Sequence, residues 1–117
     1  MKKIISSLVV ILMLVPCAFA YQAGGFYDVT DSTITVKQCL SKPDNSFVTM
    51  KGNIKKRLTS EEYLFTDKTA DIVVEIDSEK WMGQFVGVDD EIVITGEVDR
   101  DFRTVKIDVD SVQVLKN

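Results

Sequence analysis

The sequence predicts an all-β protein whose folded part is a small five-stranded barrel, and two observations support this prediction. From residue 47 onward, apolar and polar residues alternate with period two, which is typical of strands buried on one face. Two of these strands also contain a glycine between inward-facing residues, Gly52 and Gly96. Glycine weakens a strand unless the backbone must bend or approach another strand closely, and closing a small barrel requires this. A five-stranded sandwich would leave its edges open, so a barrel is the better prediction.

Five segments show the alternation. The predicted strands are centred on residues 48–54, 63–65, 72–76, 92–98 and 105–114. In the last strand the phase slips by one position between Val109 and Val112, which predicts a bulge near Asp110 and Ser111. In the second strand the pattern leaves open whether Tyr63 or Leu64 points inward.

The connections between these strands predict the topology. Residues 58–62 form a polar link, and residues 67–70 and 99–102 are expected to close tight hairpins. A short helix is predicted between the third and fourth strands, with Ser78 as its N-cap and Gly83 at its end. Three strands, a short helix and two strands form the order of the OB-fold, a five-stranded Greek-key barrel.

The first 20 residues have the pattern of a secretory signal peptide. Met1-Lys2-Lys3 is a basic head, residues 4–15 are apolar except for two serines, and Ala18-Phe19-Ala20 supplies small residues for cleavage. A membrane-spanning helix needs about 20 apolar residues, and this run is shorter. Lipid modification of Cys17 stays open as an alternative, although Pro16 before it fits such a site poorly.

The predicted organisation has three parts. A cleaved signal peptide occupies residues 1–20, an N-terminal extension with a short helix near residues 35–40 occupies residues 21–45, and the barrel occupies residues 46–117. Cleavage would change the net charge from −4 to −6, because Lys2 and Lys3 leave with the signal peptide. An acidic surface repels nucleic acid, so we expect no nucleic-acid partner.

The residue types argue against catalysis. The sequence contains no histidine, so the commonest general base and metal ligand is missing. Cys39 is the single cysteine that would remain after cleavage, so it cannot form an internal disulfide, and without histidine it is a poor nucleophile. It is expected to be either a small buried apolar residue or a free thiol. We therefore predict a monomeric binding protein, with no cofactor and no bound metal, that is not an enzyme.

The candidate ligand-binding residues are Lys55, Lys56, Arg57 and Tyr63. The three basic residues lead into the first inter-strand loop, which borders the face that OB-folds use for binding. On an acidic protein they could hold an anionic ligand such as a glycan carboxylate, and Tyr63 would add a stacking surface if it faced outward. An exposed run of loop charges is the alternative.

The carboxylates around the last hairpin are a weaker candidate, for cation binding. These residues are Asp99, Asp101, Asp108 and Asp110. Asp108 and Asp110 are two apart in a strand and so could share a face. However, no glycine follows Asp99-x-Asp101, so the spacing does not match an EF-hand loop, and a solvated acidic surface is the alternative.

Trp81 lies between the third and fourth predicted strands. Aromatic residues of OB-folds can stack against ligands, so a binding role is one interpretation. The other is that Trp81 closes the bottom of the barrel. We favour the second.

Several short motifs in order along the chain suggest a family. They are Gly24-Gly25-Phe26, Thr35-Val36-Lys37-Gln38, Lys51-Gly52-Asn53-Ile54, Tyr63-x-Phe65-x-Asp67, Glu75-Ile76-Asp77, Trp81-x-Gly83-Gln84, Gly96-Glu97-Val98-Asp99 and Ile107-Asp108-Val109. With these motifs the chain closely resembles the bacterial OB-fold family of small periplasmic stress-tolerance proteins. One departure is Ala70 after Thr69, where the family usually has glycine.

The resemblance implies an OB-fold in the periplasm, an association with tolerance of oxidative, metal and acid stress, and ligand binding without turnover. The partner would be a small molecule, a glycan of the cell wall or a cation. The alternative is a protein-interaction module that docks onto another envelope protein. Neither function requires stable membrane insertion after cleavage.

Overall fold

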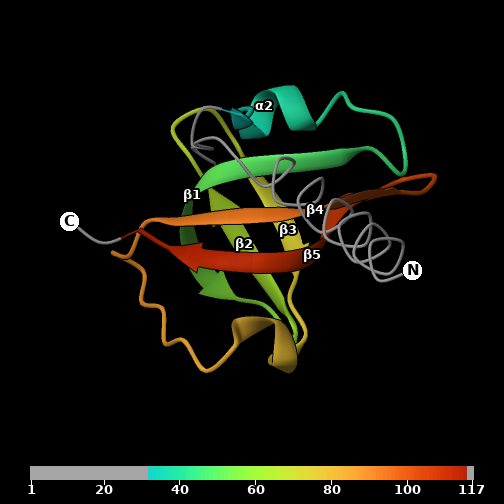
Figure 1. Cartoon of the computed structure of the whole chain (residues 1–117). Coiled ribbons are helices and arrows are strands. Elements are labelled where there is room, and N and C mark those ends of the chain that lie inside the picture. The colour runs from blue at the N-terminus through green and yellow to red at the C-terminus, as the bar shows by residue number, and fades with distance from the viewer. Residues whose placement is uncertain (1–31, 116–117) are drawn as a thin grey trace, which may run out of the picture.

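The computed structural model describes residues 32–115, which form a closed five-stranded barrel (Figure 1). The elements are α2 (Val36–Cys39), β1 (Phe47–Arg57), β2 (Glu62–Thr66), β3 (Asp71–Glu75), the 3₁₀ helix η2 (Ser78–Trp81), β4 (Ile92–Arg100) and β5 (Val105–Val114). The strands close in the order β1-β2-β3-β5-β4, and every pair is antiparallel except β3 with β5. The predicted OB-fold is therefore confirmed. The predicted signal peptide and residues 21–31 of the extension lie outside the described residues.

The core occupies the inside of the barrel. Most positions predicted to point inward are buried, among them Met50, Phe65, Val74, Ile94 and Ile107, whereas Val105 and Val114 at the two ends of β5 are only partly buried. Burial of these large apolar side chains is the main favourable contribution to folding. Figure 1 shows α2 beside β1 on one side of the barrel and η2 on the opposite side, where it leads into the long connection to β4.

Both in-strand glycines lie where two strands approach too closely for a side chain. A Cβ atom at Gly52 would collide with the carbonyl oxygen of Thr66, and one at Gly96 would collide with that of Asp108. Gly52 also marks the change of partner along β1, since it lies opposite Ile92 of β4 while the next residue pairs with β2. This confirms the prediction that the two glycines permit closure of the barrel.

Two bulges change the direction of the side chains. In β5 the residues opposite Thr95 and Gly96 are Ser111 and Val109, so Asp110 is the extra residue, as the phase of the sequence predicts. The other bulge lies in β1, where the register shifts between Ile54 and Lys56. The sequence pattern does not predict this second bulge.

The turn between β2 and β3 is built around Asp67. Its Oδ1 accepts hydrogen bonds from the backbone N–H groups of Thr69 and Ala70 and from the Thr69 hydroxyl. Its Oδ2 accepts a bond from the backbone N–H of Val36, at 2.9 Å, which attaches the first turn of α2 to this hairpin. Ala70 does not have a positive φ, so the departure from glycine at this position leaves the turn unstrained.

Two local predictions are wrong. The N-cap of η2 is Asp77, not Ser78, because Ser78 already lies in the first helical turn, and Asp77 makes no side-chain capping bond. The last hairpin loop spans residues 101–104 rather than 99–102, because β4 continues until Arg100 pairs with Val105. Gly83, with φ of 76°, does follow the end of η2, as predicted.

Candidate ligand-binding pocket

The bulge in β1 separates the three basic residues that the sequence groups together. Lys56 lies opposite Leu64 and Arg57 lies opposite Tyr63, whereas Lys55 is the extra residue of the bulge. Successive side chains of a strand point to opposite faces, so Lys56 and Arg57 face different sides of the barrel wall. Lys55 instead forms an ion pair of 3.1 Å with Asp71. The basic run is therefore not one continuous patch.

Of the neighbouring residues Tyr63 and Leu64, Tyr63 is the one that points inward. Its side chain is 6% exposed, while Leu64 is only half-buried. Its hydroxyl lies 3.4 Å from the backbone carbonyl oxygen of Ser60, to which it donates a hydrogen bond. Tyr63 therefore forms part of the core at this end of the barrel and does not offer an exposed stacking face.

Tyr63 is in contact with one aromatic ring and one cation. The rings of Tyr63 and Trp81 meet edge to face at 86°, with their centroids 5.5 Å apart, and this is a favoured geometry for two aromatic side chains. The guanidinium carbon of Arg57 lies 5.3 Å from the centroid of the Tyr63 ring. Trp81 is partly buried against the core, in agreement with the expectation that it closes this end of the barrel.

These three residues line a cavity that we call the Arg57–Trp81 pocket. Its volume is about 370 Å³, and its other lining residues are Ile54, Ser78, Gly83, Gln84, Phe85 and Val86. Gln84 is held in place, since its side-chain amide donates to the carbonyl oxygens of Trp81 and Val112, both at 2.9 Å. The pocket thus combines aromatic and aliphatic walls with one guanidinium, as small-molecule sites commonly do.

Arg57, Tyr63 and Trp81 stand out in the sequence, whereas the other lining residues of this pocket, such as Phe85, do not. Phe85 is 96% exposed and Met82 is 82% exposed, and both lie in the connection between η2 and β4. Their exposure depends on how that connection runs past the barrel, and no periodic pattern in the sequence predicts its course.

The four predicted cation-binding residues do not converge. The Oδ1 of Asp101 accepts hydrogen bonds from the backbone of Arg103 and Thr104, so this carboxylate holds its own turn together. The bonds from Thr104 and Arg103 lower the pKa of Asp101. Asp99 lies opposite Lys106, and Asp110 is the extra residue of the β5 bulge.

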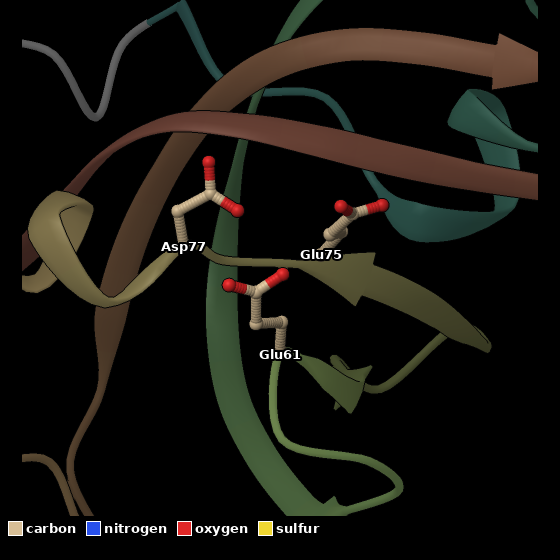
Figure 2. Close-up of side chains that lie close together, drawn as sticks. All are labelled: Glu61, Glu75 and Asp77. Carbon is tan, nitrogen blue, oxygen red and sulfur yellow. The ribbon is translucent and has the colours of Figure 1, made fainter.

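A different group of carboxylates does converge. Glu61, Glu75 and Asp77 each place one oxygen within 4.8 Å of the other two (Figure 2). Asp77 raises the pKa of Glu61 most, followed by burial and by Glu75. Counting outward from the predicted turn at residues 67–70 places Glu61 opposite Ile76, which lies between Glu75 and Asp77, so the sequence held a signal for this group.

Exposed carboxylates at such spacing are common without a ligand, and this group already has a cationic neighbour. The Nζ of Lys106 lies 3.0 Å from Glu75 and 3.3 Å from Glu62. These two carboxylates raise the pKa of Lys106, Glu75 most. The geometry therefore gives no reason to assign a metal site to Glu61, Glu75 and Asp77.

Cys39 is the remaining reactive side chain among the described residues. It is fully buried and free of any disulfide. Burial raises the pKa of the Cys39 thiol, against a smaller lowering by Arg100 and Lys42. A buried thiol that resists ionisation is a poor nucleophile, so Cys39 acts as a small apolar core residue.

The barrel, its strand order and its glycine-dependent closure define a small OB-fold protein. The chain belongs to the bacterial OB fold (BOF) protein family, whose family model matches residues 13–114. No helix among residues 32–115 is long and apolar enough to cross a bilayer.

Three proteins show how similar its relatives are. Protein YgiW of Escherichia coli K12 is 40% identical over 98 residues, which cover 84% of this chain and 75% of that protein. The calcium-regulated OB-fold protein CarO of Pseudomonas aeruginosa is 39% identical over 87 residues, which cover 74% of this chain and 75% of CarO. An uncharacterized protein of Haemophilus influenzae is 39% identical over 87 residues, which cover 74% of this chain and 72% of that protein.

Solved structures support the same fold. The structure of the hypothetical protein ygiW from E. coli superposes with a TM-score of 0.71 at 38% identity, covering 79% of this chain and 99% of that one. The p204 HINb domain superposes with a TM-score of 0.59 at 14% identity, covering 73% of this chain and 48% of that one, and shows a likeness of fold alone.

Proposed function

We propose that this protein is a periplasmic binding protein that holds a small anionic ligand in the Arg57–Trp81 pocket and does not transform it. The observation that supports this most directly is the position of the Arg57 guanidinium, over the Tyr63 ring and at the wall of a cavity of about 370 Å³. The ligand would pair an acid group with Arg57 and lay a flat or apolar part against Trp81 and Phe85. A sugar acid or a glycan end that carries a carboxylate has this chemistry.

The absence of turnover is part of the proposal. The sequence has no histidine, and the thiol of Cys39 is buried. The pocket lining offers Ser78 as its one hydroxyl besides that of Tyr63, with no base beside it in the lining. These residues can hold and orient a ligand, whereas nucleophilic catalysis needs a nucleophile next to a base.

The periplasmic location rests on the signal-peptide pattern of residues 1–20 and on the family resemblance. A role in stress tolerance of the cell envelope rests on the resemblance to the family. The name of the relative CarO describes that protein as calcium-regulated.

Trp81 provides a direct assay, because it is the only tryptophan of the sequence and lies in the pocket. We would titrate mature protein with glucuronic acid and with its uncharged amide, and record tryptophan fluorescence and melting temperature. Binding to the folded state alone raises the melting temperature with ligand concentration. The acid should bind and the amide should bind more weakly.

The matched variants are Arg57→Gln and Lys56→Gln. Both remove one positive charge from adjacent positions, but only Arg57 lines the pocket. Arg57→Gln should abolish the preference for the acid over the amide, and Lys56→Gln should keep it. Equal loss in both variants would show that bulk charge attracts the ligand, and saturable acid binding that survives Arg57→Gln would place the site elsewhere.

A second candidate function is docking onto another envelope protein. It is favoured by the exposure of Phe85, Met82 and Val88 in the connection between η2 and β4. This surface would bury the mouth of the same pocket. It predicts no stabilisation by small acids, so the fluorescence and melting assays distinguish the two functions.

A further inference from the structure

A second depression of the barrel has the opposite charge character. It lies between the β1–β2 loop and the β4–β5 hairpin, has a volume of about 340 Å³, and we call it the hairpin groove. Leu58, Val73 and Val105 supply its apolar lining, and Glu62, Asp99 and Asp101 supply its carboxylates. These two loops and the strands between them form the face on which OB-folds bind extended ligands.

The one cation of the groove lining is already neutralised. Lys106 forms ion pairs with Glu62 at 3.3 Å and with Glu75 at 3.0 Å. Asp99 lies opposite Lys106 in the sheet, yet it forms no ion pair within residues 32–115. The groove therefore keeps an excess of negative charge, because neither Asp99 nor Asp101 forms an ion pair among the described residues and Asp101 bonds only to its own turn.

The negative charge continues from the groove along β3 and β5. Glu75 lies beside Asp108 in the parallel register, and Asp77 follows on the way to η2. Burial raises the pKa of Asp108 first, followed by the charges of Glu75, Asp110 and Asp77, while Lys80 lowers it. The repulsion that raises this pKa is a cost to the folded protein, and a cation bound from outside would relieve it.

We propose that the hairpin groove is a docking site for a short basic segment of a partner protein in extended conformation. An apolar side chain of that segment would cover Leu58, Val73 and Val105, and lysine or arginine side chains two residues before and after it would meet Asp99 and the carboxylates along β3 and β5. Side chains two residues apart in an extended chain point the same way, so an apolar side chain and the basic side chains on either side of it can face the apolar floor and the carboxylates of the groove together.

The chemistry of the groove selects this occupant over others. Nucleic acid, the usual ligand of this face in other OB-folds, is repelled by the carboxylates. A bare metal ion would gain nothing from the apolar floor, and its ligands would have to converge, which the groove carboxylates do not do. The site is also separate from the Arg57–Trp81 pocket, which shares no lining residue with it.

The test uses a fluorescently labelled peptide in which serine separates lysine and valine (Lys-Ser-Val-Ser-Lys), so that lysine and valine share one face. This lysine–valine peptide is added to the mature chain and followed by fluorescence anisotropy. One comparison peptide replaces each lysine with glutamate, and another replaces each valine with serine. The lysine–valine peptide should bind more tightly than both. Its affinity should fall as salt rises from about 0.05 M to about 0.5 M, because screening weakens contacts between exposed charges.

Asp99→Asn should weaken peptide binding about two- to fivefold, which is the effect of losing one exposed ion pair. The matched control is Asp89→Asn, an exposed carboxylate outside the groove lining that carries the same charge. Leu58→Ser, in the loop rather than in a strand, tests the apolar floor with little risk to the fold and should also weaken binding. Arg57→Gln should leave peptide binding unchanged, so this result is independent of the proposed function.

Equal losses in Asp99→Asn and Asp89→Asn would overturn the proposal, since they would show attraction to the net charge alone. Equal affinity for the lysine–valine and lysine–serine peptides would overturn it as well, because the apolar floor would then contribute nothing. No saturable binding of the lysine–valine peptide at low salt would rule the groove out directly.

Discussion

Arg57 and Tyr63 lie directly opposite each other on β1 and β2, and the guanidinium carbon of Arg57 is 5.3 Å from the centroid of the Tyr63 ring. The bulge at Lys55 produces this relationship, because it turns Arg57 toward the side on which Tyr63 packs. A cation over an aromatic face is attracted by the quadrupole of the ring. The contact therefore holds the guanidinium at the wall of the Arg57–Trp81 pocket before any ligand arrives.

The first prediction is that Arg57 and Tyr63 contribute to stability as a coupled pair. In a double-mutant cycle of Arg57→Met and Tyr63→Leu, followed by chemical denaturation, the coupling should be about 0.5–1 kcal/mol, because the guanidinium is partly in water. The control cycle combines Lys56→Met with Tyr63→Leu and should be additive within about 0.3–0.5 kcal/mol. Equal coupling in the two cycles would mean that the Arg57 contact does not stabilise the fold.

The same bulge shows where sequence reasoning reaches its limit. In β5 the apolar residues Val109 and Val112 are three positions apart, so they show where the alternation of inward and outward residues shifts, and the bulge at Asp110 could be predicted from them. In β1 the bulge falls within Lys55-Lys56-Arg57, where no apolar residue marks a phase. Charged residues tolerate either face at a strand end, so the side of Arg57 could not be predicted.

Tyr63 and Leu64 present a related ambiguity. Both are large and largely apolar, so the period alone cannot choose between them, and pairing with β1 and β3 decides that Tyr63 points inward. The pocket adds a further difficulty, because its wall at Phe85 comes from a connection without regular structure. The strands could thus be predicted from local pattern, whereas the site depends on contacts between distant segments.

The second prediction concerns closure of the barrel at Gly96. Gly96→Ala should destabilise the protein by about 1–3 kcal/mol, because the new Cβ would collide with the backbone carbonyl of Asp108, which cannot move aside without disturbing β5. Gly87→Ala is the matched control, since a Cβ there meets only the Asp90 carboxylate at 3.7 Å. That variant should stay within about 0.5 kcal/mol of the parent in urea denaturation. Similar stability of both variants would contradict the close approach.

The third prediction is that the chain is cleaved after Ala20 during export. The basic head, the short apolar run and the small residues at Ala18 and Ala20 all favour this position. Intact-mass spectrometry of the periplasmic fraction should give a protein that begins with Tyr21. A mass that includes residues 1–20, or one that begins at Cys17 with added lipid, would refute it.

The fourth prediction concerns the pH dependence that Asp67 gives to the fold. Burial by itself raises the pKa of Asp67, but hydrogen bonds from the Thr69 hydroxyl and from the backbone N–H groups of Val36, Thr69 and Ala70 outweigh it and leave the pKa below its ordinary value. A carboxyl whose pKa falls on folding stabilises the protein above its unfolded pKa, and that stabilisation is lost as the pH falls through the folded value.

Asp67→Asn should therefore be less stable than the parent at pH 7, because an amide cannot accept all four of these hydrogen bonds. The difference in unfolding free energy should shrink as the pH falls below about 4, where Asp67 takes up a proton in the unfolded parent, and should go on shrinking until the folded parent is protonated at lower pH. Denaturant titrations of both proteins between about pH 7 and pH 2.5 measure this difference. Asp89→Asn controls for the change of net charge, since Asp89 is exposed in the connection before β4. A difference that stays constant over the whole range would show that the charge of Asp67 does not hold α2 against the β2–β3 turn.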